Sequence, residues 1–152
     1  MIELDLQNDV GLTDVPEPSL FKRWIEAALQ QPYTELEQTI RVVDEAESRT
    51  LNHDYRLQDK PTNVLSFPAE MNEFLDYQNL GDLVICAPVV AREADQQGKT
   101  LEAHWAHMVV HGMLHLQGYD HIDETQAEQM ELLEIEILAT LGHTNPYSSN
   151  NI

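Results

Sequence analysis

The sequence predicts an α+β fold, in which a small mixed β-sheet of about four strands packs with five or six helices. Three observations lead to this prediction. Short segments with alternating apolar and polar residues are typical of half-buried strands. Longer segments carry the three- and four-residue apolar spacing of amphipathic helices. The expected order is strand, helix, strand, helix, strand, strand and then three helices, which favours a mixed sheet.

Four segments are expected to form the strands. In the first, Ile2, Leu4 and Leu6 alternate with polar residues. The other three cover residues 39–43, 63–67 and 82–86. Pro68 ends the third strand, because proline has no N–H group to offer to a sheet. The acidic segment 69–78, which precedes the fourth strand, is expected to be a loop.

The expected helices are marked by the residues that begin or end them. They cover residues 19–30, 45–52, 88–97, 101–117 and 124–141. Asp44, Thr100 and Asp123 are each expected to be an N-cap, whose side-chain oxygen accepts a hydrogen bond from the first turn. Gly98 is expected to end the third helix in a left-handed conformation. The fourth helix should be central and buried, because apolar residues occupy most of its circumference.

The chain of 152 residues suits one domain, spanning residues 1–152, with a single sizeable core. No Gly/Ser-rich or Pro-rich stretch supplies a linker to a second domain. The polar tail, residues 143–152, is expected to be frayed. The last helix is acidic and is expected to present a solvated face. Its acidic residues include Glu128, Glu131, Glu134 and Glu136.

The charge of the chain limits the classes of partner. It has 27 acidic and 8 basic residues, and its formal net charge is −19. Such a balance argues against bulk attraction to nucleic acid or to an anionic membrane. Every Lys and Arg lies at or before Lys99, and four of the eight lie between residues 41 and 60. An anionic substrate would therefore have to meet a local basic patch from the first half of the chain.

Several features favour a soluble, cytoplasmic protein with no membrane partner. Cys86 is the one cysteine, so the chain forms no internal disulfide, which fits a reducing compartment. The acidic N-terminus is unlike a signal peptide. No apolar run approaches the roughly 18 residues that a membrane span needs.

Histidines gather on one face of the expected fourth helix. Five of the seven histidines lie between residues 104 and 121. On a helix, four of them fall within one arc of about 80°. These four are His104, His107, His111 and His115. We expect His104 to be a hydrogen-bonded core residue, because a buried polar group without a partner costs about 1–3 kcal/mol.

The segment HGMLHLQGYDH, residues 111–121, has the form H-x-x-x-H-x-x-G-x-x-H. His111 and His115 point the same way, one turn apart, and can close on one ion. Gly118 lets the backbone leave the helix, so that His121 can reach the same ion. Three imidazoles leave a fourth tetrahedral position open, which is the arrangement of a catalytic zinc site. We therefore predict one Zn²⁺ per chain, or another divalent transition metal, with His107 hydrogen-bonded nearby but not a ligand.

This histidine spacing is that of the metzincin peptidases, except at one position. Their general-base Glu is replaced here by Gly112, which cannot take a proton from water. The general base stays open, since Asp82, Asp120 or a second water could serve. Asp120 and Asp123 could instead orient the imidazoles of the ligands.

Two further blocks accompany the histidine string. Residues 52–67, NHDYRLQDKPTNVLSF, fit the pattern N-x-x-Y-R-x-x-D-x-P-T-[DN]-V-L-S-F, and residues 80–83, LGDL, fit L-G-D-[IL]. Together the three blocks, over residues 51–121, resemble the YbeY family of metal-dependent endoribonucleases. The blocks also occur in that family's order.

The resemblance implies a single α+β domain that binds zinc and cleaves single-stranded RNA. It implies a role in maturation of the 3′ end of 16S ribosomal RNA and in ribosome quality control. The implied partners are ribosomal RNA and the ribosome or its associated proteins, and no DNA is expected. His111, His115 and His121 would be the metal ligands, and Arg56 the catalytic basic residue that faces the metal. A guanidinium fork could hold transition-state phosphate charge. Arg49 and Lys60 could bind the substrate strand.

Other functions stay open. The chain could be a peptidase or another metal-dependent hydrolase, although the missing Glu at position 112 counts against a peptidase. It could be a non-catalytic ribosome-associated factor whose metal only stabilises the fold. A metal-storage or sensing protein is not favoured by a single open site. The net charge of −19 counts most against RNA as substrate. An acidic protein can still bind RNA through a local basic cleft or when docked on a partner.

Overall fold

The structure is a computed structural model that describes residues 2–9, 11–33, 35–69, 78–120 and 122–147. Its element order is the one that the sequence predicts, with four strands and five helices in the described residues. The strands are β1 (Ile2–Gln7), β2 (Leu36–Val43), β3 (Val64–Pro68) and β4 (Gln78–Cys86). The helices are α1 (Pro18–Ala28), α2 (Glu45–Arg56), α3 (Ala87–Gln97), α4 (Leu101–Leu116) and α5 (Glu124–Thr140).

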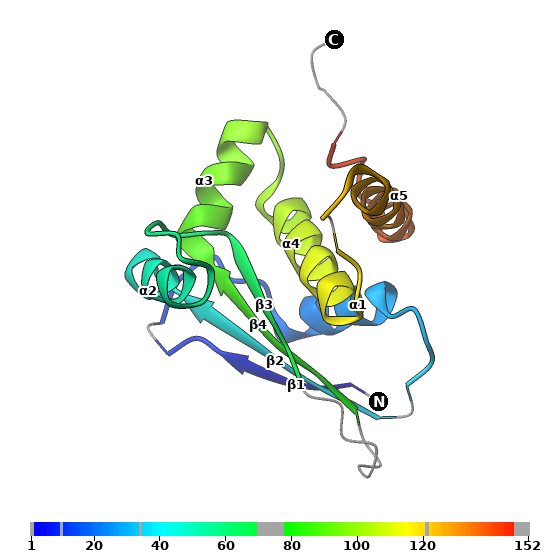
Figure 1. Cartoon of the computed structure of the whole chain (residues 1–152), viewed down its shortest axis with the longest axis horizontal. Helices are drawn as coiled ribbons and strands as arrows, with labels where there is room; N and C mark the ends of the chain where they lie inside the picture. The colour runs from blue at the N-terminus through cyan, green and yellow to red at the C-terminus, as the bar shows by residue number, and fades with distance from the viewer. Residues whose placement is uncertain (1, 10, 34, 70–77, 121, 148–152) are drawn as a thin grey trace.

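The four strands form one mixed sheet in the order β1-β2-β4-β3. β1 and β2 are parallel, β2 and β4 are parallel, and β3 runs antiparallel to β4 at one edge. In Figure 1, α1 and α4 lie on one side of this sheet and α2 on the other, with α5 outside α4. The α+β prediction with a small mixed sheet is therefore confirmed.

The central position of the histidine helix is also confirmed. α4 contacts β3, β4, α1, α3 and α5. Most of its length is buried, including Trp105, Val109 and Met113, which are fully inside the core. A helix that is apolar around most of its circumference reaches this environment because it must bury that surface on several sides.

Leu83 of β4 sets how closely α4 approaches the sheet. Leu83 is fully buried, and a Cβ placed on Gly112 would lie 2.7 Å from Leu83 Cδ2. Glycine at position 112 therefore allows a close helix–sheet contact, and this contact holds the following turn of α4 beside β3.

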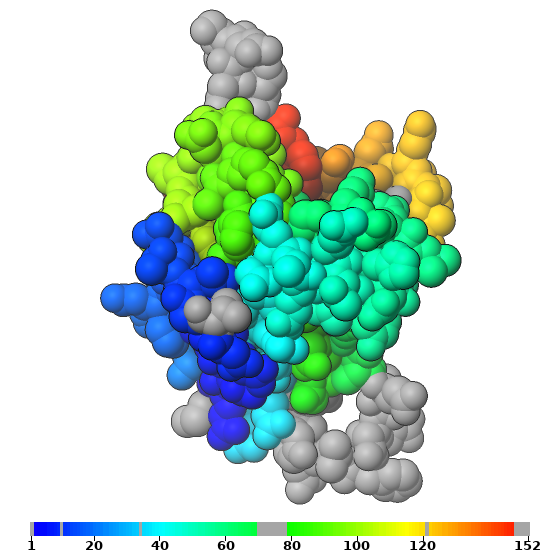
Figure 2. All heavy atoms as spheres, turned by 90° about the vertical axis from the view of Figure 1, so that its left-hand side faces the viewer, coloured from blue at the N-terminus to red at the C-terminus, as the bar shows by residue number. Residues whose placement is uncertain are grey.

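The face of the sheet opposite α4 carries a second, smaller apolar cluster. It consists of Val43, Leu65, Val84, Cys86 and Val89. α2 packs over it through Leu51. Figure 2 shows this side of the molecule, where α2 and the segment that follows it, coloured cyan to green, form the middle of the surface. The sheet thus fixes α2 and α4 on either side of the edge strand β3.

Three predicted helix beginnings are confirmed by their hydrogen bonds. The side chains of Asp44, Thr100 and Asp123 each accept a bond from a backbone N–H in the first turn. The predicted end of α2 at residue 52 was too early, because the helix continues to Arg56. It ends where Leu57 adopts a left-handed conformation (φ 58°) and its N–H bonds back into the last turn. Leucine is not a usual residue for this conformation, so the sequence carried no stop signal there.

The sequence predicts a frayed tail over residues 143–152, of which residues 148–152 lie outside the described residues. Residues 143–147 are described and turn back toward the helices, beginning with a hydrogen bond from His143 N–H to Leu138 O (2.9 Å). The hydroxyl of Tyr147 then bonds to Glu134 on α5. The polar composition of this segment gave no indication of the contact, which depends on the side chain of Tyr147. Within the described residues, no helix combines the length and the apolar character needed to cross a membrane.

Candidate metal centre

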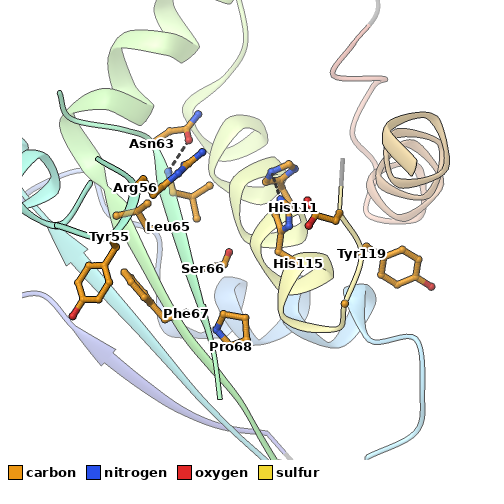
Figure 3. Close-up of a pocket in the computed structure, with 13 residues that line it drawn as sticks. Tyr55, Arg56, Asn63, Leu65, Ser66, Phe67, Pro68, His111, His115 and Tyr119 are labelled. Atoms are coloured by element: carbon orange, nitrogen blue, oxygen red, sulfur yellow. Dashed lines mark hydrogen bonds between the residues drawn. The ribbon is translucent and has the colours of Figure 1, made fainter. Parts of the chain in front are cut away.

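A cavity of about 760 Å³ opens between the end of α2, the edge strand β3 and the last turns of α4. Arg56, Ser66, His111, His115 and Asp120 are among the residues that line it. Figure 3 shows His111 and His115 projecting from α4 on one side of the cavity, with Arg56 on the other side and β3 between them. The predicted helical spacing therefore brings two histidines to the cavity, and the end of α2 brings Arg56 there.

The two histidines of α4 face each other through their Nε2 atoms, which lie 3.1 Å apart. A tetrahedral ion at 2.0–2.1 Å from two nitrogens would separate them by about 3.3–3.4 Å. The observed separation is close to that value, so a small shift of either ring would accommodate one ion. The donor chemistry and the spacing of His111 and His115 fit zinc.

The other ring nitrogen of His111 is held by a buried carboxylate. His111 Nδ1 lies 2.7 Å from Glu134 Oε1, and Glu134 has no exposed surface. An ionised carboxylate only accepts hydrogen bonds, so His111 must carry its proton on Nδ1. The neutral ring then has its lone pair on Nε2, which is the nitrogen that faces His115.

Glu134 accepts hydrogen bonds from two further side chains. The hydroxyl of Tyr147 donates to Oε2 at 2.6 Å, and Nε2 of His107 lies 3.3 Å from Oε1. Burial alone would raise the pKa of Glu134, but the hydrogen bonds from His107 and His111 outweigh it and lower this pKa to about 2. Burial and the adjacent Glu134 raise the pKa of Tyr147, so its hydroxyl keeps the proton that it donates.

The burial of Glu134 corrects the expectation of a wholly solvated acidic helix. Glu128, Glu131 and Glu136 are exposed as predicted, but Glu134 is not. The spacing of apolar residues on the helix predicts that position 134 is buried, although its charge alone suggests exposure. On α5, Met130, Ile137 and Leu138 are buried, and Glu134 lies four residues after Met130 and three before Ile137. It therefore occupies the apolar face of the helix.

His104 and His107 are both buried, and neither lines this cavity in the described structure. Nε2 of His104 bonds to Glu93 Oε1 at 2.9 Å, which confirms the prediction of a hydrogen-bonded core residue. Burial lowers the pKa of His104, although the contact with Glu93 partly opposes this shift. His107 contacts Tyr147 and Glu134, so it belongs to the hydrogen-bond network behind His111.

The third predicted ligand, His121, lies outside the described residues, and its assignment stays a prediction. Within the ranges that are described, no three His, Cys, Asp or Glu side chains form a group that could hold an ion. Asp120, just before His121, lines the cavity. Asp123 instead serves as the N-cap of α5. Asp82 is exposed and pairs with Phe67 in the sheet, away from the described lining of the cavity.

The three basic residues expected at the substrate site do not all lie at the cavity. Arg56 lines the cavity, and the role toward a metal that the resemblance implies for it stays a prediction. Arg49 forms a two-pronged ion pair with Asp59, with N···O distances of 2.7 and 2.9 Å. In the described lining of the cavity, Arg49 and Lys60 are both absent. Arg56 is thus the guanidinium that the fold places opposite the histidines.

The sequence is similar to those of known proteins. The family described as Endoribonuclease YbeY matches residues 6–142 of the sequence. The chain belongs to this family. The YbeY match extends well beyond the blocks at residues 51–121 and covers nearly all of the described fold.

YbeY relatives match over almost their whole length. Endoribonuclease YbeY of Pseudomonas entomophila (strain L48) is 58% identical over 151 residues, covering 99% of this chain and 96% of that protein. Endoribonuclease YbeY of Stutzerimonas stutzeri (strain A1501) is 57% identical over 152 residues, covering 99% of this chain and 94% of that protein. The solution structure of TM1509 from Thermotoga maritima has a TM-score of 0.54 and 24% identity, covering 99% of this chain and 98% of that one. At that identity it supports the fold alone.

Proposed function

We propose that the protein is a zinc-dependent endoribonuclease that cleaves single-stranded RNA. We further propose that it acts in maturation of the 3′ end of 16S ribosomal RNA and in ribosome quality control. One observation carries the proposal. His111 and His115, with their Nε2 atoms 3.1 Å apart, share a cavity of about 760 Å³ with Arg56. A cation site opposite a guanidinium is suited to an anionic, phosphate-containing substrate. Membership of the YbeY family supports RNA as that substrate.

The proposed zinc ligands are His111, His115 and His121, with one ion per chain. The first two would bind through Nε2, because these atoms face each other and Glu134 holds the Nδ1 proton of His111. When bound, zinc supplies Lewis-acid activation of water and of a phosphoryl oxygen. Another divalent transition metal could take its place, since imidazole suits several of them.

Arg56 would bind the phosphate that is cleaved. Its guanidinium offers two parallel N–H donors to phosphate oxygens. It ends α2, which the sheet holds on the side of β3 opposite α4. The charge that develops on the phosphate would therefore be held from the side opposite the two histidines.

The walls of the cavity offer further contacts to a single strand. Tyr55 is 67% exposed, and its ring packs edge-on against Phe67 with centroids 5.0 Å apart. An exposed aromatic ring that a neighbour holds in place suits stacking with an unpaired base. Ser66 also lines the cavity and donates from Oγ to Gly112 O (3.4 Å), which links β3 to α4.

The net charge of −19 requires affinity from elsewhere. Among the described residues that line the cavity, Arg56 is the one Lys or Arg. One such contact supplies little of the phosphate neutralisation on which RNA affinity depends. We therefore propose that the protein acts while docked on the ribosome or on a ribosome-associated protein.

The test incubates zinc-loaded protein with single-stranded ribosomal RNA and, separately, with casein. The expected result is RNA cleavage that chelation abolishes and zinc restores, with casein intact. His111→Ala, which removes a proposed ligand, should cleave neither substrate. Chelator-sensitive cleavage of casein by the wild-type protein would contradict the proposed substrate class. RNA cleavage at an undiminished rate by His111→Ala would contradict the proposed metal site.

A further inference from the structure

We propose that Glu134, held in place by Tyr147, is a positioning residue for the metal centre. It fixes the ring orientation and the protonated nitrogen of His111, so that Nε2 is presented to the ion. This inference rests on the proposed function only in taking His111 as a metal ligand. Neither Glu134 nor Tyr147 lies in the matched sequence blocks at residues 51–121.

The hydrogen bond at Nδ1 does two things to the His111 ring. At 2.7 Å it is short enough to restrict rotation of the imidazole. It also selects the tautomer, because a carboxylate accepts a proton and does not supply one. In free imidazole side chains both tautomers are accessible, and the form protonated on Nε2 cannot bind an ion there. Fixing the proton on Nδ1 removes that competing form.

Glu134 is itself fixed by groups that leave it little freedom. Its two oxygens accept hydrogen bonds from three side chains, two on α4 and one on the segment that follows α5. His111 and His107 of α4 approach Oε1 at 2.7 and 3.3 Å, and Tyr147 donates to Oε2 at 2.6 Å. Such a network holds the carboxylate against rotation about its last torsion, which is what an orienting partner requires.

The buried negative charge of Glu134 independently favours a cation nearby. A fully buried carboxylate needs a nearby positive charge or a full set of donors to offset its lost hydration. The sequence has no Lys or Arg after Lys99. Within the described residues, the ion pairs of Glu134 are with His107 and His111 alone. A cation bound to the far nitrogen of His111 would supply that charge through a single ring.

Tyr147 reaches Glu134 because the chain reverses after α5. Gly142 has a φ of 88°, a conformation that glycine adopts readily, and the backbone turns back there. The hydroxyl of Tyr147 also lies 3.2 Å from Nε2 of His107, so it joins both members of the network. The segment after α5 therefore contributes a side chain to the metal centre without binding the ion.

The experiment measures metal binding without RNA. Glu134→Gln keeps the shape of the side chain but removes its charge, and Tyr147→Phe removes one hydroxyl. Cobalt and zinc affinities are measured by competition with a chromogenic chelator at fixed pH. The Co²⁺ absorption spectrum reports the ligand field. The tautomer of His111 is read from ring ¹⁵N shifts in the metal-free protein.

We expect a loss of affinity of about 10–100-fold for Glu134→Gln, the usual scale for a lost orienting partner. A smaller loss is expected for Tyr147→Phe, which leaves the carboxylate in place. The metal-free wild type should show His111 protonated on Nδ1, and both variants should shift it toward protonation on Nε2. Two matched controls should leave all readouts unchanged. Glu128→Gln removes an exposed charge from the same helix, and Tyr33→Phe removes a hydroxyl outside the network.

Wild-type affinity and tautomer in both Glu134→Gln and Tyr147→Phe would overturn the inference. If Glu134→Gln does not fold, a metal-free wild type with His111 protonated on Nε2 would overturn the role of Glu134. An unchanged tautomer and affinity in Tyr147→Phe would overturn the role of Tyr147. An RNA-inactive wild type whose metal affinity still falls in Glu134→Gln would contradict the proposed function while supporting the role of Glu134. The two failures are therefore distinguishable.

Discussion

Gly112 of α4 lies against Leu83 of β4 so closely that a Cβ at position 112 would come within 2.7 Å of Leu83 Cδ2. Leu83 is fully buried and has little room to move. The position that holds the general base in metzincin peptidases is thus a packing position in this fold. A side chain there would point at the sheet and not at the cavity.

Gly112→Glu is expected to destabilise the fold and to create no peptidase. Overpacking costs about 1–3 kcal/mol, and a carboxylate buried without a partner adds to this cost. The gain in helix propensity from replacing glycine is only about 1 kcal/mol, so the loss prevails. Urea unfolding and casein hydrolysis measure the two effects.

Ala103→Glu is the matched control for that substitution. It places the same side chain at a partly exposed position in the first turn of α4, where a negative charge suits the helix dipole. Its stability should be close to that of the wild type. A Gly112→Glu protein that is equally stable would show that Leu83 yields easily.

His104 is expected to make the metal-free protein less stable as pH falls. Its folded pKa is lowered, chiefly by burial, from an ordinary value of 6.5. Below about pH 6.5, His104 binds a proton in the unfolded chain but not in the folded chain. The stability therefore declines as pH falls, until the lowered pKa of folded His104 is reached. Urea unfolding between pH 8 and 5, with chelator present, should show a shallower decline in His104→Gln.

His53→Gln is the matched control, because it removes an exposed imidazole by the same substitution. His104→Gln should also be less stable than the wild type at pH 8, by about 1 kcal/mol, since Glu93 loses its imidazole partner but keeps Asn63. An unchanged pH dependence in His104→Gln would assign the acid sensitivity to other groups.

Arg56 is expected to act on the chemical step and not on metal binding. Arg56→Ala should stay folded and retain zinc, while RNA cleavage falls by about 10²–10³, the usual scale for losing one preorganised donor. Arg56→Lys should recover only part of the rate, because an ammonium keeps the charge but not the two-pronged geometry. Metal content, melting temperature and cleavage rate are measured on each variant.

His115→Ala provides the contrast, since metal occupancy, thermal stability and cleavage should fall together. Arg56→Ala at the wild-type cleavage rate would reduce Arg56 to a surface residue. Loss of both zinc and fold in Arg56→Ala would make its role structural.

The metal itself should be bound through three histidine nitrogens at about 2.0–2.1 Å, with one ion per chain. Because imidazole binds metal only when neutral, affinity should fall as pH drops below about 6.5. X-ray absorption spectroscopy and elemental analysis of freshly purified protein measure these properties. Cysteine or carboxylate ligands in the first coordination sphere would show that the histidine triad is misassigned.

Much of the fold was predictable because its signals are local. The alternation that predicts β1 lies within that strand, at Ile2, Leu4 and Leu6. Each N-cap lies next to the helix that it begins, at Asp44, Thr100 and Asp123. The pairing of His111 with His115 was predictable for the same reason, since four residues make one helical turn.

The rest of the site depends on contacts that no local pattern specifies. Glu134 is 23 residues beyond His111 and its charge suggests exposure, yet the packing of α5 on α4 buries it. Tyr147 reaches the network only because the chain turns at Gly142. The end of α2 at Arg56 depends on a left-handed leucine, which sequence reasoning disfavours.

The most direct test of the central claim is a zinc titration of the metal-free protein, followed by the rate of cleavage of a single-stranded ribosomal RNA fragment. We expect the rate to rise linearly with zinc up to one ion per chain and then to stay constant. His115→Ala should show no such rise at the same zinc concentrations. RNA cleavage by the metal-free wild type at the full rate, or a zinc-saturated wild type that leaves the RNA intact, would contradict the central claim.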